Sequence, residues 1–303
     1  ISRDLHVSRT AIWKHINILK ERGYIFESST RKGYRLIYAP NLLTPLEIDS
    51  ALHTETFGRH VVYLSSTTST NEEAKKIARE GAEEGTIVVA EEQTGGRGRL
   101  TRSFYCPFAK GIWFTLILRP KFFPLEASKC TLMAAVGVCR GIRRLGLQDA
   151  GIKWPNDILY HGKKLVGILT EMSASMEKID YIIIGAGINT GMKKSEFPEL
   201  FRENATSFLA EGIDVSRKDL LAAILAELEK EYEIAQTQGF DKVLEDWKAL
   251  SVTLGQDVRV IMGEENYTGK AVDIDKDGCL LVDTGEKVER VITHNAEERL
   301  EFH

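Results

Sequence analysis

Paired cysteines are missing from this chain of 303 residues, whose four cysteines lie far apart in the sequence. None of Cys106, Cys130, Cys139 and Cys279 stands in a C-x-x-C pair, which argues against structural zinc, a dithiol redox motif and a disulfide framework. The sequence also lacks an H-E-x-x-H motif, a histidine cluster and a Ser-His-Asp signature. We therefore expect no metalloprotease or serine-hydrolase chemistry.

Long hydrophobic runs are missing as well. The chain has no stretch of about 18 apolar residues, and no charged, apolar and small-residue signal segment opens it. We expect a protein that spans no membrane and works in the cytoplasm. Because 43% of its residues are hydrophobic, it can bury a substantial core, and we expect two or three domains.

The chain has little net charge, but its positive and negative residues are unevenly distributed along the sequence. The formal net charge is −4, yet residues 1–38 hold eight Lys and Arg against three Asp and Glu, a net charge of +5 that leaves −9 for the remainder. A basic head on an acidic body predicts a nucleic-acid contact that is confined to the head, because neutralisation of phosphates drives such binding.

The head has the order of a helix-turn-helix followed by a hairpin. Ser8 is a good N-cap for a basic helix that should end near Gly23, and residues 24–27 and 34–38 are β-prone pieces on either side of a basic turn, as in the wing of a winged helix. The sequence starts inside this motif, so we expect another helix before Ile1. A solvated amphipathic helix is the alternative to DNA binding. The predicted DNA contacts are Arg9, Thr10, Lys14, Asn17, Arg31 and Lys32.

A glycine-rich loop, EQTGGRGRLTRSF, occupies residues 92–104 and follows a β-branched run. We expect its glycines at positive φ, close to a ligand, and its arginines as forked donors for phosphate or carboxylate. It lacks the Gly-Lys-Ser/Thr ending of a P-loop and the helix that follows a dinucleotide fingerprint. A mobile surface loop is the alternative. The residues in question are Gly95, Gly96, Gly98, Arg97, Arg99 and Arg102.

Residues 152–172 contain a second cluster. The motif KWPND precedes a hairpin turn that delivers Lys163 and Lys164 into an apolar strand. An ammonium there needs a partner, and an anionic ligand would supply one. Alternatively, Lys164 reaches solvent by snorkelling.

Polar side chains also stand at a predicted strand-to-helix junction, residues 69–71. Thr70 and Glu73 form a T-x-x-E capping box that should open a helix over residues 71–80. Ser69, Thr70 and Asn71 either cap this helix or bind a polar ligand.

Two other stretches imitate known motifs and are rejected. Residues 185–191 have G-x-G-x-x-x-G spacing and no convincing helix after them, so they are not a dinucleotide site, although close approach to a ligand remains open. Residues 273–284 begin like an EF-hand but end in Thr284 rather than Glu.

Apolar periodicity predicts the remaining elements. Strands are expected at residues 61–64, 86–90, 112–118 and 181–184, and helices at 132–142, 220–235 and 240–250. From residue 251, short strands at 258–261, 267–274, 279–282 and 288–292 predict a small β-barrel.

Taken in order, these motifs resemble one family. The partial winged helix is followed by TSTN (68–71), EEQTGGRGR (91–99), KWPND (153–157), KKLVGIL (163–169) and GAGIN (185–189), and the chain ends in short strands. This order resembles the bifunctional biotin protein ligases that are also biotin operon repressors, over essentially the whole chain. The resemblance implies an α+β fold in four parts. The first two are a winged helix-turn-helix at residues 1–40 that lacks its first helix and a linker helix at 41–60. The others are a central mixed-sheet ligase domain flanked by helices at 61–250 and an SH3-like barrel at 251–303.

The resemblance also implies an activity. Biotin and ATP, with Mg²⁺, would give biotinyl-5'-AMP, and biotin would then pass to a lysine of biotin carboxyl carrier protein. The adenylate would act as corepressor, and homodimers would bind operator DNA. The glycine-rich loop at residues 92–104, the arginine loop, would order around the adenylate. A ligand-responsive transcription factor without ligase activity and a lipoate-type ligase are the alternatives.

The roles of individual residues follow from the resemblance alone. Lys164, Arg97 and Arg99 would be catalytic, with Lys163 in place of Lys164 if the register slips. Thr101 and Phe104 depart from the glycine and tryptophan that are usual in the family, and both departures fall on the side that would contact adenine. Biotin would bind to Ser69, Thr70, Asn71, Gln93, Gly96, Arg97, Lys164, Gly167 and Gly185, and ATP or the adenylate to Arg99, Arg102, Phe104, Lys153, Asn156, Asp157 and Asn189, with Asp157 near Mg²⁺.

Overall fold

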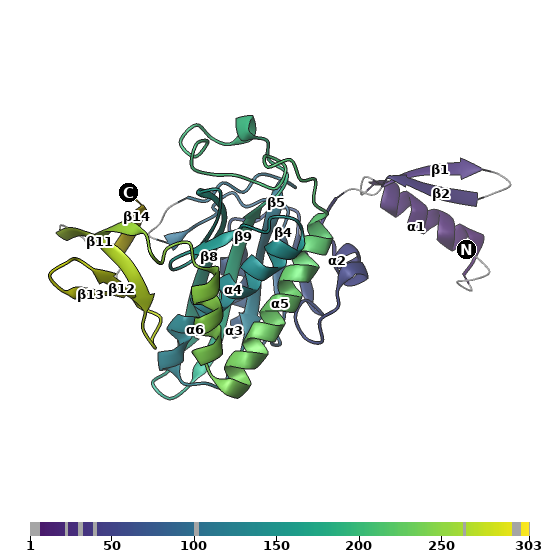
Figure 1. Cartoon of the computed structure of the whole chain (residues 1–303). Coiled ribbons are helices and arrows are strands. Elements are labelled where there is room, and N and C mark those ends of the chain that lie inside the picture. The colour runs from purple at the N-terminus through teal and green to yellow at the C-terminus, as the bar shows by residue number, and fades with distance from the viewer. Residues whose placement is uncertain are drawn as a thin grey trace. The chain divides into compact units, whose positions relative to one another are not determined.

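The computed structural model describes residues 7–21, 24–29, 33–38, 41–99, 103–262, 265–292 and 298–302. The chain divides into two compact units, residues 1–42 and 43–303 (Figure 1). Residues 1–6, with which the helix-turn-helix motif begins, lie outside the described residues, and so do Arg31, Lys32, Thr101 and Arg102.

The small unit contains the predicted helix and hairpin. Helix α1 (Arg9–Glu21) begins where Ser8 Oγ accepts a hydrogen bond from the amide of Ala11 at 3.1 Å. Strands β1 (Ile25–Ser29) and β2 (Gly33–Tyr38) pair in antiparallel fashion, and Ile16 and Tyr24 are buried. The cap, the helix and the wing-like hairpin are therefore confirmed.

The large unit is built on a seven-stranded mixed sheet in the order β3-β4-β5-β9-β8-β7-β6. Strands β3 and β4 are parallel and every other pair is antiparallel. All eight residues of β5 are buried, as its continuous apolar run predicts. The strands are β3 (Val61–Leu64), β4 (Ile87–Ala90), β5 (Gly111–Leu118), β6 (Gly151–Lys153), β7 (Asp157–Tyr160), β8 (Lys163–Ala174) and β9 (Ile179–Asn189).

Helices cover both faces of this sheet. The apolar side chains of β4, β5 and β9 alternate, so that one set packs on α3 and the other on the larger helical layer. Ser216 caps α5 by accepting from the amide of Asp219, and α5 therefore begins at Arg217 rather than at residue 220. The helices are α2 (Pro45–Ala51), α3 (Thr70–Arg79), α4 (Cys130–Arg144), α5 (Arg217–Gln238) and α6 (Asp241–Leu250), with 3-10 turns at Pro124–Lys129 and Lys194–Glu196.

The predicted linker helix needs a correction. Helix α2 forms, but Leu43, Ile48, Leu52 and Phe57 are buried in the main core of the large unit, and α2 packs against α5. The boundary between the units falls between residues 42 and 43. Residues 43–60 are part of the body because their apolar side chains find a larger core there than a free linker could offer.

A five-stranded antiparallel sheet in the order β13-β12-β11-β10-β14 ends the large unit. Four of its strands were predicted, and the fifth, β14, was not. The SH3-like character of this part stays a prediction. No helix in the described part of the chain is long and apolar enough to span a membrane. The strands are β10 (Asp257–Met262), β11 (Glu265–Ile274), β12 (Leu280–Asp283), β13 (Val288–Val291) and β14 (Glu298–Phe302).

Candidate functional site

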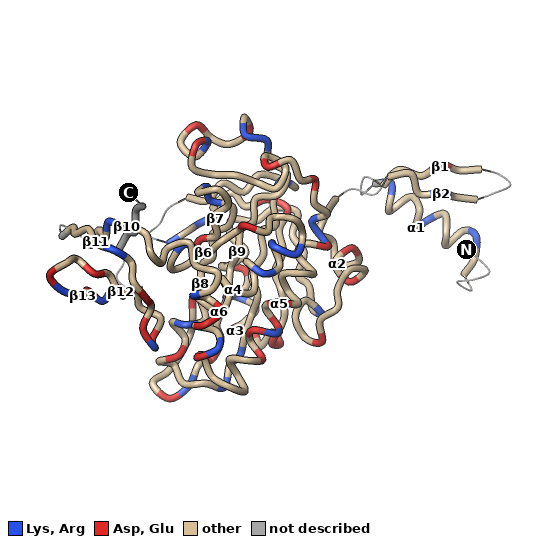
Figure 2. Tube along the Cα trace, viewed as in Figure 1, with Lys and Arg blue, Asp and Glu red and all other residues tan. Residues whose placement is uncertain are grey.

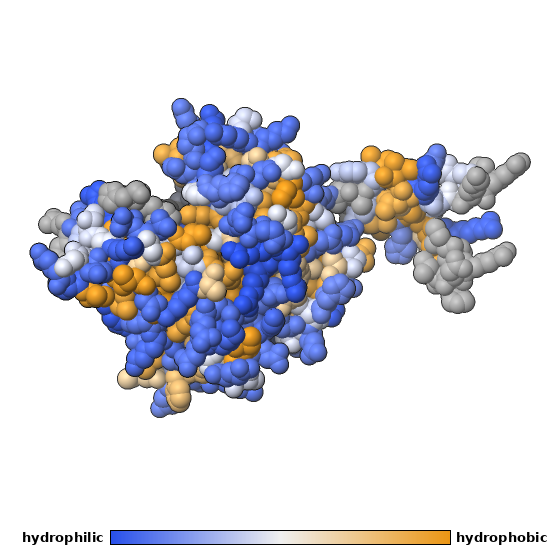
Figure 3. Space-filling view, viewed as in Figure 1, coloured by the Kyte–Doolittle hydropathy of each residue, from blue (hydrophilic) through white to orange (hydrophobic). Residues whose placement is uncertain are grey.

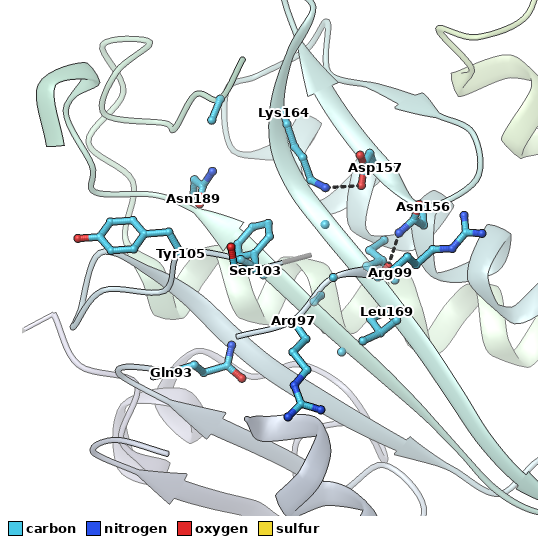
Figure 4. Close-up of a pocket in the computed structure, with 18 of the residues that line it drawn as sticks. Gln93, Arg97, Arg99, Ser103, Tyr105, Asn156, Asp157, Lys164, Leu169 and Asn189 are labelled. Carbon is cyan, nitrogen blue, oxygen red and sulfur yellow. Dashed lines mark hydrogen bonds and ion pairs between the residues drawn. The ribbon is translucent and has the colours of Figure 1, made fainter. Parts of the chain in front are cut away.

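A cavity of about 640 Å³ lies where the arginine loop, the start of α3 and strands β7, β8 and β9 meet (Figure 4). Most residues that the motifs singled out line it, although they come from five separate stretches of the chain. Gly96 is adjacent and does not line it. The predicted residues on its wall are Ser69, Thr70, Asn71, Gln93, Arg97, Arg99, Phe104, Lys153, Asn156, Asp157, Lys164, Gly167, Gly185 and Asn189.

The arginine loop folds back on itself at the edge of the cavity. The amide of Phe104 donates to the carbonyl of Gly96 at 2.8 Å, and Arg97 forms a β-bridge with Ser103. Figure 4 shows Arg97 and Arg99 leaving the loop in different directions, with Arg99 extending toward Asn156. The loop therefore presents its two described arginines to different parts of the site.

The expectation of positive φ is wrong for Gly95 and Gly96. These glycines are required by close packing instead. A Cβ on Gly96 would lie 2.6 Å from the carbonyl oxygen of Phe104 and 2.8 Å from Cys106 Sγ, and one on Gly95 would lie 2.7 Å from Thr68 Cγ2. The absence of a side chain lets the two arms of the loop touch.

Lys164 has a protein partner, contrary to the expectation that an anionic ligand would supply it. Its Nζ lies 2.7 Å from Asp157 Oδ1 (Figure 4), and 5.7 Å from the ring centroid of Phe104. The Lys164 side chain is 35% exposed, and it reaches the cavity from the hairpin whose turn is His161-Gly162, with both residues at positive φ. The ammonium is therefore held at the cavity wall by a carboxylate that also faces the cavity.

Phe104 lines the cavity and packs against two glycines, one on β8 and one on β9. A Cβ on Gly187 would lie 2.8 Å from its ring, and one on Gly167 would lie 3.1 Å from it. Trp113 packs edge-on against the same ring with centroids 6.0 Å apart. The glycines of GAGIN and KKLVGIL thus leave room for an aromatic side chain, which is the close approach that the sequence left open.

The predicted capping box at residues 70–73 does not form. Ser69 is the N-cap of α3, and Thr70 Oγ1 instead lies 3.0 Å from Gln93 Oε1 and 2.8 Å from Thr115 Oγ1. The amide of Thr70 also donates to Gln93 Oε1, at 2.7 Å. Gln93 of the arginine loop and Thr115 of β5 have replaced the local cap. The hydroxyl of Thr70 therefore joins the polar groups at the cavity and does not cap the helix.

Gln93 is held by a buried thiol on its other side. Its Nε2 donates to Cys106 Sγ at 3.2 Å, and burial raises the pKa of the Cys106 thiol to about 12. The thiol therefore stays neutral and acts here as a small polar contact rather than as a nucleophile.

The KWPND segment is fixed by two turns of the C-terminal part of the chain, one before β10 and one between β11 and β12. Trp154 Nε1 donates to the carbonyl of Gly278 at 3.1 Å, and the amide of Trp154 donates to Thr253 Oγ1 at 2.9 Å. Asn156 Nδ2 donates to the carbonyl of Ile168 at 2.7 Å. Through these contacts the turn that carries Asn156 and Asp157 is tied to the last part of the chain.

Sequence reasoning missed several residues that support the site through contacts with other residues. Thr115 looks like any residue of a buried strand, Glu91 like a charge after a strand and Glu171 like a charge within one, so no local signal marks them. The segment at residues 197–205 also reaches the cavity, through Phe197, Leu200, Phe201, Asn204 and Ala205.

The predicted DNA-contact face of α1 is accessible. Arg9, Thr10 and Lys14 are exposed and Asn17 is partly exposed, and Figure 2 shows the basic positions along the helix. Trp13, which was not predicted as a contact, is 55% exposed on the same face. Apolar atoms also appear on the surface of this unit in Figure 3.

Comparison with known proteins identifies the family. Residues 63–189 match the Biotin/lipoate A/B protein ligase family, residues 253–295 the biotin protein ligase C terminal domain, and residues 1–35 an HTH domain. The chain is 41% identical over 298 residues to the bifunctional ligase/repressor BirA of Bacillus spizizenii, a match that covers 98% of this chain and 92% of that protein. This chain belongs to the bifunctional ligase/repressor family.

Other members of the family agree with this assignment. The bifunctional ligase/repressor BirA of Escherichia coli is 30% identical over 283 residues, which cover 93% of this chain and 86% of that protein. Among solved structures, the biotin protein ligase from Aquifex aeolicus in complex with biotin and ATP superposes with a TM-score of 0.69 at 28% identity, covering 81% of this chain and 100% of that one.

Proposed function

We infer that this chain is an ATP-dependent biotin protein ligase that also represses transcription through its helix-turn-helix unit. The observation that carries this function is the convergence of Lys164, the arginine loop and the Thr70–Gln93 cluster on one cavity. The family's two activities and the basic α1 support the repressor role.

The chemistry begins with two anions. Biotin carboxylate would attack the α-phosphorus of ATP, giving biotinyl-5'-AMP and pyrophosphate. A lysine of biotin carboxyl carrier protein would then attack the mixed anhydride and release AMP. Neither step needs a protein nucleophile, so catalysis rests on positioning and on neutralising charge.

Lys164 is proposed to stabilise the first step. Its Nζ is within 2.7 Å of Asp157 and faces the cavity, where it can turn to the biotin carboxylate and the α-phosphate. Arg97 and Arg99 would add donors when the loop orders over the ligand.

Two sets of residues on the cavity wall suggest how biotin and ATP would lie. The hydroxyls and amide of Ser69, Thr70 and Gln93 would hold the ureido ring of biotin, with Gly167 and Gly185 in the wall. Phe104, Lys153 and Asn156 would face the nucleotide. Asn189 Oδ1 is buried and lacks a hydrogen-bond partner among the described residues, which leaves it able to accept from the adenylate.

Mg²⁺ is proposed to enter with ATP. Asp157 places one carboxylate at the cavity wall, and the described residues contain no cluster of three or more metal-binding side chains. One carboxylate fits an ion whose other ligands are substrate phosphates and water.

Carrier protein and operator DNA are the proposed partners, and a homodimer is proposed for DNA binding. Strand β8 pairs with β7 only up to Gly167, whereas its pairing with β9 continues to Ala174. In the described part of the chain, no strand covers the outer edge of residues 169–174, so two copies could pair there edge to edge. Because the reaction consumes ATP, we propose a cytoplasmic location.

The proposal is tested by incubating the protein with biotin and Mg-ATP and looking for biotinyl-AMP by mass spectrometry. The adduct should appear together with pyrophosphate. A protein that binds biotin and DNA without forming the adduct would be a ligand-responsive transcription factor instead, and a protein that adenylates lipoate in preference to biotin would be a lipoate-type ligase.

A further inference from the structure

Asn71 lies over the sheet at the polar end of the cavity, the part lined by Ser69, Thr70 and Gln93. Thr115 on β5 and Leu169 on β8 both stand opposite Gly185 on β9, so the three form a row across the sheet. A Cβ on Gly185 would overlap Asn71 Oδ1. The amide of Asn71 therefore fills the space that Gly185 leaves open, and it touches β5 on one side and β8 on the other.

Glu171 decides which way round this amide lies. Asn71 Nδ2 is 2.8 Å from Glu171 Oε2 and 3.4 Å from the carbonyl oxygen of Leu169. A carboxylate can only accept hydrogen bonds, so Asn71 must turn its NH₂ group toward Glu171. Asn71 Oδ1 then faces Thr115 Oγ1, at 2.7 Å. Because an amide oxygen only accepts, the hydroxyl of Thr115 must donate to it.

The same constraint reaches Thr70. Thr115 Oγ1 lies 2.8 Å from Thr70 Oγ1, and the single proton of Thr115 is already committed to Asn71. The proton of Thr70 must therefore go to Thr115 or to Gln93 Oε1, which is 3.0 Å away. In either case it points into the protein. Thr70 can offer the cavity only a lone pair.

We propose that Glu171 is a positioning residue that makes Thr70 an obligatory hydrogen-bond acceptor and so selects ligand rings that carry N–H groups. The proposal rests on the function inferred above, since the ureido ring of biotin has two such groups. A ring without N–H, such as a cyclic disulfide, would leave the Thr70 acceptor unpaired, which is an effective way to reject a ligand.

Lys75 contacts both Glu171 and Glu72, so Glu72 offers a matched control for a substitution of Glu171. Its Nζ lies 2.6 Å from Glu171 Oε1 and 3.0 Å from Glu72 Oε1, and Glu72 is half-exposed on α3. Glu171→Gln keeps the shape of the side chain but can donate as well as accept. With its oxygen toward Lys75 and its NH₂ toward Asn71, it favours the turned-over Asn71 amide, which loses only the 3.4 Å contact with the carbonyl of Leu169. Glu72→Gln removes the other carboxylate beside Lys75 and leaves the contact with Asn71 intact.

The first measurement is a calorimetric titration of biotin into the full chain. Glu171→Gln should weaken biotin binding about tenfold, equivalent to about 1.4 kcal/mol. Glu72→Gln should stay within about twofold of the wild type, as expected for an exposed ion pair. Equal affinities of Glu171→Gln and the wild type would overturn the proposal. A wild-type protein that binds no biotin would instead overturn the proposed function, and this result is seen before any variant is compared.

The second measurement separates selection from simple structural support. In two isomeric biotin analogues, one ring N–H is replaced by oxygen. The wild type should reject the isomer whose oxygen meets Thr70 by about 100-fold, because two acceptors then face each other. In Glu171→Gln this rejection should fall to about tenfold or less, since Thr70 can then donate. If biotin and both analogues lose affinity by the same factor, Glu171 only supports the fold and the proposal fails.

Discussion

Arg217 Nη1 lies 2.7 Å from Glu91 Oε2, and both side chains are buried. Glu91 Oε1 also accepts from the amide of Leu43 at 2.7 Å, and Arg217 Nε donates to the carbonyl of Gly111 at 2.9 Å. Burial lowers the pKa of Arg217, and the Glu91 carboxylate opposes that shift. This pair ties the start of the arginine loop to β5, to α5 and to the first residue of the body.

Breaking this pair should destabilise the large unit. Arg217→Met would leave the Glu91 carboxylate buried without a cation and lower the free energy of unfolding by about 3–5 kcal/mol. Adding Glu91→Gln should recover part of that loss. Urea denaturation followed by circular dichroism measures both. The control is Glu203→Gln, at an exposed pair with Lys194, which should change nothing measurable. A wild-type midpoint for Arg217→Met would contradict the prediction.

Lys164→Ala should abolish the first chemical step. Removing the ammonium takes away a charge that neutralises the two reacting anions, and the rate of biotin-dependent pyrophosphate release should fall at least about 10²–10³-fold. Lys163→Ala is the control, because Lys163 is the neighbour that a one-residue register slip would select. A larger effect from Lys163→Ala than from Lys164→Ala would reverse the assignment.

Gly185→Ala should damage the polar end of the cavity, because the new methyl group overlaps the Asn71 amide. We expect biotin affinity to fall by about tenfold or more, a change of about 1.4 kcal/mol. Gly191→Ala is a matched control in the next turn of chain, since the nearest atom to its Cβ would be 3.8 Å away. Equal biotin affinities for the two variants would show that Asn71 gives way without cost.

The double variant Arg9→Ala, Lys14→Ala should weaken binding to duplex DNA and leave pyrophosphate release unchanged. Each lost phosphate contact should reduce the slope of log affinity against log salt by about 0.9. Removing two positive charges from the other unit, with Lys178→Ala and Lys194→Ala, controls for net charge. If both double variants bind DNA alike, α1 is not the contact helix.

The arginine loop should become resistant to trypsin when the adenylate is bound, because Arg97 and Arg99 would then be engaged with it. The rate of cleavage at these two arginines, followed by mass spectrometry with and without biotin and ATP, measures this. A cleavage rate that does not respond to the ligands would mean that the loop does not close over them.

The sequence by itself determined the order of the motifs, the charge of the head and most of the strands and helices. These features are local, because a strand or helix is marked by the period of its apolar residues and a loop by its glycines. The order of the motifs also specified the family, and most of the residues that they singled out line one cavity.

Only the tertiary structure decided how the polar groups are used. Thr70 was predicted as part of a helix cap and instead contacts Gln93 and Thr115, which are 23 and 45 residues away in the chain. The pairs Glu91–Arg217 and Asn71–Glu171 span even longer separations. Such contacts leave no trace in local spacing, because they depend on which strands become neighbours in the sheet. These long-range contacts therefore decide which groups of the site donate hydrogen bonds and which accept them.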